Sequence, residues 1–232
     1  MNNMNFKIKV PLTDQEAESI FQKELPLVTP VMIRKYGDAF NLASRLTNLP
    51  IQVLYSFALI ESRGTHNNPS GLVHVTGAEK STGIMQISPN MFYEVYYKEN
   101  RAGRISDEIK KTVKRYVPID FDNRKTPTSA NQYTFNMVAT ALKDYRFNIL
   151  ASSIVLRRLL EESANNDLTM RLDKAIVKYN VGMYSRPTRT NEYKMGDTTA
   201  LLRVVPSITN KYIRNIVGKN GALTYMIKNN IK

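Results

Sequence analysis

The stretch that decides the fold runs from Pro50 to Gly64 and reads PIQVLYSFALIESRG. Apolar residues recur through it at helical spacing, which predicts a buried helix. Asn48 is a suitable N-cap, and Pro50 suits the first turn, where an N–H would have no helical partner. Gly64 favours a stop, because glycine accepts a left-handed backbone. The sequence therefore predicts a helix whose last turn carries Glu61.

Glu61 stands where a carboxyl group tends to keep its proton. The C-terminal end of a helix presents a partial negative charge, which opposes ionisation by about 0.3–1 kcal/mol. Apolar neighbours raise the pKa of a carboxyl group further by desolvation. A carboxyl group protonated near neutral pH is what a general acid for glycoside cleavage requires. Glu61 is therefore a candidate acid, although a solvated glutamate at a helix end has the same local sequence.

The segment that follows changes character. Residues 65–82 are rich in Gly, Asn, Pro and Ser and contain a short alternating run, which predicts a loop with a small β-hairpin. The stretch Ser81–Pro89 then reads STGIMQISP. Gly83 allows a close backbone approach, and Pro89 is suited to open another helix. These features predict a tight turn that carries Gln86.

These motifs, in this order, resemble the lytic transglycosylases of the soluble lytic transglycosylase and goose-type lysozyme group. The segment NILASSIVL at 148–156 is similar to that group's Asn-Ile helix, and AIVKYNVG at 175–182 is similar to its Tyr-Asn-x-Gly motif. The resemblance covers about residues 45–218. It implies an α+β, mainly α, lysozyme-like fold with a small β-hairpin lobe beside the catalytic cleft.

The resemblance also implies a function. The substrate would be peptidoglycan glycan strands, cleaved at the β-1,4 bond between N-acetylmuramic acid and N-acetylglucosamine without a cofactor or metal. Glu61 would be the general acid, and then the base that takes the proton of the C6 hydroxyl, which closes a 1,6-anhydro end. Tyr179 would hydrogen-bond near Glu61 and orient it. The substrate-binding residues would be Ser62, Gly83, Met85, Gln86 and Asn180. Alternatively, Tyr179 is a core residue and Gln86 stabilises its own turn.

A second carboxylate would change the chemistry, because glycosidases that use water generally need two. Glu79 is the only acidic residue between Glu61 and Gly83, but Lys80 follows it in a stretch typical of an exposed turn. Two alternatives therefore stay open. One is a hydrolytic lysozyme that uses Glu61 and Glu79, and the other is a non-catalytic basic virion protein on a lysozyme-like scaffold. A pure scaffold has no need of the whole motif set, which favours the enzyme.

The composition limits the partners. The chain has 33 basic and 20 acidic residues, a net charge of +13, which attracts polyanions. The basic residues are spread along predicted helices, and no nucleic-acid-binding motif accompanies them. The absence of cysteine excludes disulfides and thiol catalysis. The two histidines, His66 and His74, are predicted to be polar residues of the β-containing lobe rather than metal ligands. No eighteen-residue apolar span predicts a transmembrane segment.

The organisation of the chain predicts one main domain. Residues 1–30 are expected to form an N-terminal extension, with a short helix at 13–24 and a proline-containing linker, that could dock onto other virion proteins. Residues 31–232 are expected to form the transglycosylase domain. Helices are predicted near 31–46, 50–63, 89–99, 106–116, 131–145, 147–163, 168–180 and 207–217, with a last one to about 229. The N-terminus lacks the apolar core of a secretory signal. This favours a bacteriophage enzyme in the virion, or in the host cytoplasm with release to the periplasm and cell wall.

Overall fold

The structure is a computed structural model that describes residues 10–66, 81–123, 125–163, 172–181, 202, 205 and 207–232. In this part of the chain the fold is mainly helical, which confirms the predicted class at that level. The helices are α1 (Ser19–Thr47), α2 (Ile51–Ser62), α3 (Pro89–Arg101), α4 (Asp107–Tyr116), α5 (Gln132–Ala141), α6 (Tyr145–Ser163), α7 (Leu172–Val181), α10 (Ser207–Val217) and α11 (Ala222–Lys228). The hairpin was predicted within 65–82, and most of that stretch lies outside the described residues.

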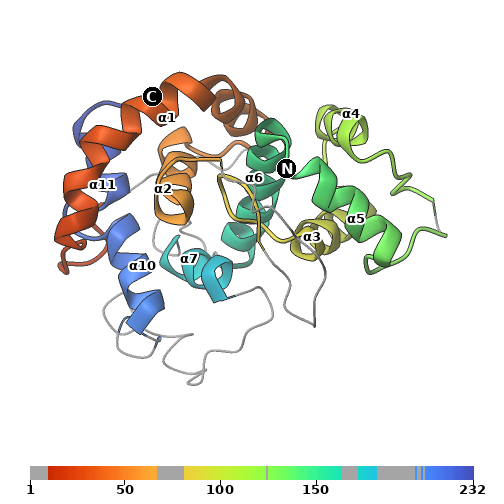
Figure 1. Ribbon diagram of the computed structural model, residues 1–232. Coiled ribbons are helices and arrows are strands. Elements are labelled where there is room, and N and C mark those ends of the chain that lie inside the picture. Colours follow the sequence, from red (N-terminus) through yellow and green to blue (C-terminus); the bar gives the residue numbers. More distant parts are fainter. Residues whose placement is uncertain are drawn as a thin grey trace.

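The helix α2 occupies the centre of the fold. Eight of its residues are buried, on all sides of the helix: Ile51, Val53, Leu54, Tyr55, Ser56, Phe57, Ala58 and Leu59. A helix that is apolar all round must be covered on every side, and α1, α10 and α11 all pack against α2. Figure 1 shows α2 (orange) inside the arc formed by α1, with α10 and α11 beside it. Packing against these helices therefore fixes the position of α2, including its C-terminal end.

The first helix differs from its prediction. One helix, α1, runs through Pro26 and Pro30, where a break between two helices was predicted. Both prolines lie on the exposed side, while the buried side continues past them through Phe21, Leu25 and Met32. Burial of that side outweighs the lost backbone hydrogen bonds, and proline bends a helix without ending it when packing holds both halves. Figure 1 shows α1 as one curved helix along the outer edge. It therefore spans the predicted domain boundary at residue 30.

The ends of α2 also differ in detail from their prediction. Asn48 does not cap α2; it ends α1 in a left-handed conformation, with φ 53° and its backbone N–H bonded to Ser44 O. Pro50 takes the N-cap position of α2 instead. At the other end both Arg63 and Gly64 have positive φ, and the Gly64 N–H bonds to Ala58 O at 3.1 Å. This arrangement caps the helix, and Glu61 lies in its last turn as predicted.

The helix α6 forms the other central element. It packs against α1, α3 and α7, and its buried residues include Asn148 and Arg157. The Arg157 side chain has no exposed surface; its Nε donates to Glu161 Oε1 at 2.7 Å and its Nη1 donates to Asn48 O at 3.3 Å. A buried charge needs such partners, so Arg157 ties α6 to the α1–α2 junction. None of the helices in the described ranges is both long and apolar enough to cross a bilayer.

Candidate active site

The site is built around the carboxyl group of Glu61. The side chain is partly buried at the end of α2, and Tyr212 on α10 donates its hydroxyl hydrogen to Glu61 Oε1. Burial raises the pKa of Glu61 from 4.5 to about 7, and the hydrogen bond from Tyr212 opposes this rise. Burial and the nearby carboxylate raise the pKa of Tyr212, so its phenol keeps its proton and remains a donor. Glu61 can therefore both give and take a proton near neutral pH.

The second part of the site is the tight turn at 82–87. Thr82 N–H bonds to Ile87 O at 3.1 Å, and Ile87 N–H bonds to Thr82 O at 3.2 Å. Gly83 and Gln86 within the turn have positive φ, of 81° and 46°. A Cβ at Gly83 would stand 2.1 Å from Asn148 Nδ2. Glycine is therefore needed here both for its conformation and for the space that the amide of Asn148 occupies.

Asn148 holds the turn from α6. Its Oδ1 accepts the Met85 N–H at 3.0 Å, while its Nδ2 donates to Thr82 O at 2.8 Å and to Leu142 O at 3.3 Å. The side chain is fully buried, where unpaired polar groups are costly. The sequence segment that begins with Asn148 was singled out for its resemblance to an Asn-Ile helix, and the structure places it directly behind the glutamine turn.

Three further side chains complete the support of the turn. Ser62, next to Glu61, donates its hydroxyl to Ile84 O at 2.7 Å, also lying 3.0 Å from Ala58 O. Tyr179 donates its hydroxyl to Met85 O at 2.7 Å. His66 Nδ1 accepts the Ile84 N–H at 3.1 Å. With Asn148, every backbone polar group of Ile84 and Met85 is thus bonded to a side chain. The turn is fixed relative to α2, α6 and α7.

The role predicted for Tyr179 needs correction. Its hydroxyl was expected to hydrogen-bond near Glu61 and orient it. Burial and the nearby Glu61 charge do raise the pKa of Tyr179, but its hydroxyl donates to Met85 O and not to Glu61. The phenol that contacts Glu61 belongs to Tyr212, which the sequence reasoning missed. Tyr212 lies 151 residues away along the chain in a helix with no motif recognised in the sequence. Helical spacing alone marks it as one more buried residue beside Ile213 and Ile216, so no local signal distinguishes it.

The side-chain amides of Gln86 and Asn180, both predicted to bind substrate, each use a different polar atom in a hydrogen bond within the protein. Gln86 donates from Nε2 to Gly83 O at 2.6 Å, within its own turn. The structural alternative for Gln86, a turn-stabilising amide, is therefore realised, and its Oε1 is the end not used in this bond. Asn180 accepts at Oδ1 from the Thr209 hydroxyl at 3.0 Å, a bond in which its Nδ2 takes no part. Both side chains are partly exposed.

The remaining predicted residues either support the turn or lie outside the residues that the structure describes. Met85 has no exposed surface, so its side chain supports the turn from the core. Glu79 and His74 lie outside the described residues. His66 is bonded to backbone groups of two segments. Within the described ranges, no three His, Cys, Asp or Glu side chains are grouped so that they could hold a metal ion.

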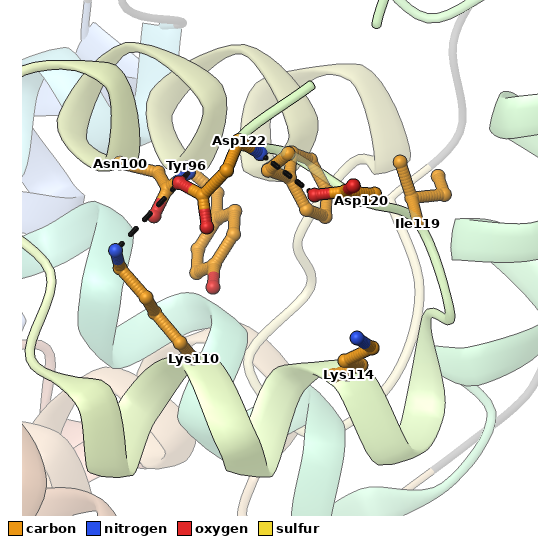
Figure 2. Close-up of a pocket in the computed structure, with 8 residues that line it drawn as sticks. Tyr96, Asn100, Lys110, Lys114, Ile119, Asp120 and Asp122 are labelled. Atoms are coloured by element: carbon orange, nitrogen blue, oxygen red, sulfur yellow. Dashed lines mark hydrogen bonds and ion pairs between the residues drawn. The ribbon is translucent and has the colours of Figure 1, made fainter.

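A pocket of about 60 Å³ lies apart from this site, between α3, α4 and the loop that follows α4. Figure 2 shows its lining residues, including Tyr96, Asn100, Lys110, Lys114, Asp120 and Asp122. Asp122 Oδ1 accepts from Asn100 Nδ2 at 3.0 Å and lies 3.7 Å from Lys110 Nζ. None of the residues that hold Glu61 or the glutamine turn lines this pocket. The carboxyl group whose pKa burial raises to about 7 lies outside this pocket, so the candidate active site is the Glu61 cluster.

No protein-family model, curated protein or solved structure matches this chain. The function must therefore be argued from the geometry and chemistry of the Glu61 cluster.

Proposed function

We propose that this protein is a peptidoglycan lytic transglycosylase with a lysozyme-like fold and with Glu61 as its single acid and base. One observation carries the proposal: a carboxyl group with a pKa of about 7 is tied through its neighbour Ser62 to the turn that carries Gln86. General acid–base catalysis is most effective when the pKa of the group lies near the working pH. The net charge of +13 suits approach to the acidic polymers of a bacterial envelope.

In the first step, protonated Glu61 gives its proton to the glycosidic oxygen between N-acetylmuramic acid and N-acetylglucosamine. The C1–O bond breaks, its electron pair goes to the leaving oxygen, and positive charge develops at C1. Glu61 becomes a carboxylate at this moment. The Tyr212 hydrogen bond favours the carboxylate form, since it lowers the pKa of Glu61. Tyr212 therefore assists proton release.

In the second step, the Glu61 carboxylate takes the proton of the C6 hydroxyl of the same muramic acid. The hydroxyl oxygen attacks C1 and closes the 1,6-anhydro ring, and Glu61 returns to its protonated form. No water is consumed, and one carboxyl group serves both steps. The transglycosylase reaction therefore needs no second carboxylate, whereas the hydrolytic alternative would need Glu79 to provide one. This difference favours the transglycosylase.

The two amides support an N-acetylated sugar as the substrate. The end of Gln86 outside its bond to Gly83 is an acceptor, Oε1, and the end of Asn180 outside its bond to Thr209 is a donor, Nδ2. An acetamido group offers one N–H donor and one carbonyl acceptor, and sugar hydroxyls offer both. A pair of amides that offers one acceptor and one donor therefore suits such a substrate better than an anionic or wholly apolar one.

The test is cleavage of purified peptidoglycan in ¹⁸O-labelled water, followed by mass spectrometry of the released muropeptides. The proposal predicts 1,6-anhydromuramyl ends without ¹⁸O. Reducing ends that carry ¹⁸O would show hydrolysis instead, and loss of those ends in a Glu79→Gln protein would assign the second carboxylate. A folded protein that releases no muropeptides would contradict both enzymatic functions and favour a non-catalytic virion protein on this scaffold.

A further inference from the structure

We infer that His66 is a positioning residue, which holds the glutamine turn in place as a neutral imidazole with its proton on Nε2. The hydrogen bonds of His66 do not depend on the identity of the substrate. Only the predicted effect on glycan cleavage rests on the proposed function.

The two ring nitrogens of His66 face backbone groups of opposite kind. Nδ1 lies 3.1 Å from the Ile84 nitrogen, whose N–H can only donate. Nε2 lies 2.8 Å from the Lys143 carbonyl oxygen, which can only accept. A neutral imidazole has one donor and one acceptor nitrogen. Only the tautomer with hydrogen on Nε2 satisfies both partners, so the surroundings select one of the two neutral forms.

The ring is placed by contacts with α1 and α6. The backbone N–H of His66 donates to the Tyr36 hydroxyl at 3.3 Å. The ring stands edge-on to Tyr145, with centroids 6.2 Å apart and planes at 71°, and Tyr145 packs against Tyr36 at 5.0 Å. His66 follows α2 by four residues, so it links the end of the Glu61 helix to the connection between α5 and α6.

The bond to Ile84 matters because that residue is fully buried. A buried N–H that loses its acceptor costs about 1–3 kcal/mol, and the turn can recover this only by moving. Gln86 lies two residues further along the same turn. Loss of the His66 acceptor is therefore expected to displace Gln86 while leaving the burial of Glu61 and its bond to Tyr212 in place. The effect should fall on substrate binding more than on proton transfer.

Protonation of the ring would have the same effect as loss of the acceptor. A proton on Nδ1 sets an N–H against the Ile84 N–H, and the bond is lost. The neutral ring with its hydrogen on Nε2 is therefore the form that holds the turn.

The first test is an NMR measurement on the Glu61→Gln protein, which needs no activity. Long-range ¹⁵N–¹H spectra should show His66 protonated at Nε2 and unprotonated at Nδ1. A ring protonated at Nδ1 or a mixture of neutral tautomers would overturn the inference.

The second test compares three variants of the active protein. In His66→Asn, Oδ1 can stand where Nδ1 stood and accept the Ile84 N–H. In His66→Gln, the amide reaches the position of Nε2 instead, and His66→Phe offers neither group. One neutral hydrogen bond corresponds to roughly a tenfold change. We expect KM for peptidoglycan fragments to rise about tenfold in the Gln and Phe proteins and to stay within about threefold in the Asn protein.

The outcomes separate the two proposals. Equal effects of Asn and Gln would contradict the role of His66, as would a change confined to kcat. The expected NMR result in a protein that cleaves no glycan would leave the positioning role of His66 intact and contradict the proposed function instead.

Discussion

Replacement of Glu61 by glutamine should stabilise the protein at alkaline pH and have little effect at acid pH. Burial holds the pKa of Glu61 at about 7, above its usual 4.5. The folded protein therefore binds this proton more tightly than the unfolded chain does. Stability is highest below about pH 4.5, falls as the pH rises from 4.5 to 7, and stays reduced above 7, where the buried group is ionised.

The magnitude follows from these two values. Each pKa unit corresponds to about 1.4 kcal/mol, so ionised Glu61 destabilises the folded state by roughly 3 kcal/mol. Solvent reaching this partly buried group reduces the effect, and we expect about 2 kcal/mol. A glutamine has nearly the same shape, never ionises, and can accept the Tyr212 hydroxyl hydrogen at its own Oε1. The Glu61→Gln protein should recover this free energy at pH 8, and only a small part of it at pH 5.

The assay is urea denaturation of both proteins at pH 5 and pH 8. Glu108→Gln is the control, because Glu108 is an exposed carboxylate whose ion pair with Arg45 lowers its pKa. That substitution should give no gain at pH 8. An equal gain from Glu61→Gln at both pH values, or no gain at pH 8, would refute the conclusion that burial keeps a proton on Glu61.

Three further predictions concern other parts of the structure. Tyr212→Phe removes the hydrogen bond that lowers the pKa of Glu61, so the alkaline fall in muropeptide release should move to higher pH; a shift to lower pH in the pH–rate profile would contradict this. Gly83→Ala should lower the free energy of unfolding, measured in urea, well beyond Gly103→Ala. Both glycines have positive φ, but a Cβ meets a buried amide at 2.1 Å only at Gly83, so the Gly103 change should cost only about 1–2 kcal/mol, and equal losses would be inconsistent with the clash. Arg157→Ala leaves a partly buried carboxylate and a cavity behind, and thermal unfolding should show a loss of about 3–5 kcal/mol; a loss below 1 kcal/mol would contradict it.

Much of the helical framework could be predicted because helical periodicity and local stop signals agree there. The structure places α3, α4 and α6 within a few residues of their predicted bounds, and α10 at its predicted bounds. The predictions failed where burial overrode a local signal. Pro26 and Pro30 are helix breakers in the sequence, but α1 continues because its buried side does. Local propensity cannot reveal how strongly the other side of a helix is packed.

The candidate site was predictable in part for a similar reason. Glu61, Ser62, Gly83 and Gln86 lie in short motifs, and the resemblance that those motifs carry led us to expect them together. Tyr212 lies far along the chain in an unremarkable helix, and only the packing of α10 against α2 brings it to Glu61. The support of the turn by His66 was also hidden, because a side chain that bonds to backbone groups leaves no pattern in the sequence.

The most direct test of the central claim is muropeptide release from purified peptidoglycan by the Glu61→Gln protein, compared with the unaltered protein at neutral pH. Both proteins should be folded, with matching circular dichroism spectra. Our account predicts rapid release of anhydro-muropeptides by the unaltered protein and none above background by the Glu61→Gln protein, since no other group is proposed to supply the proton. Undiminished release by a folded Glu61→Gln protein would contradict the account.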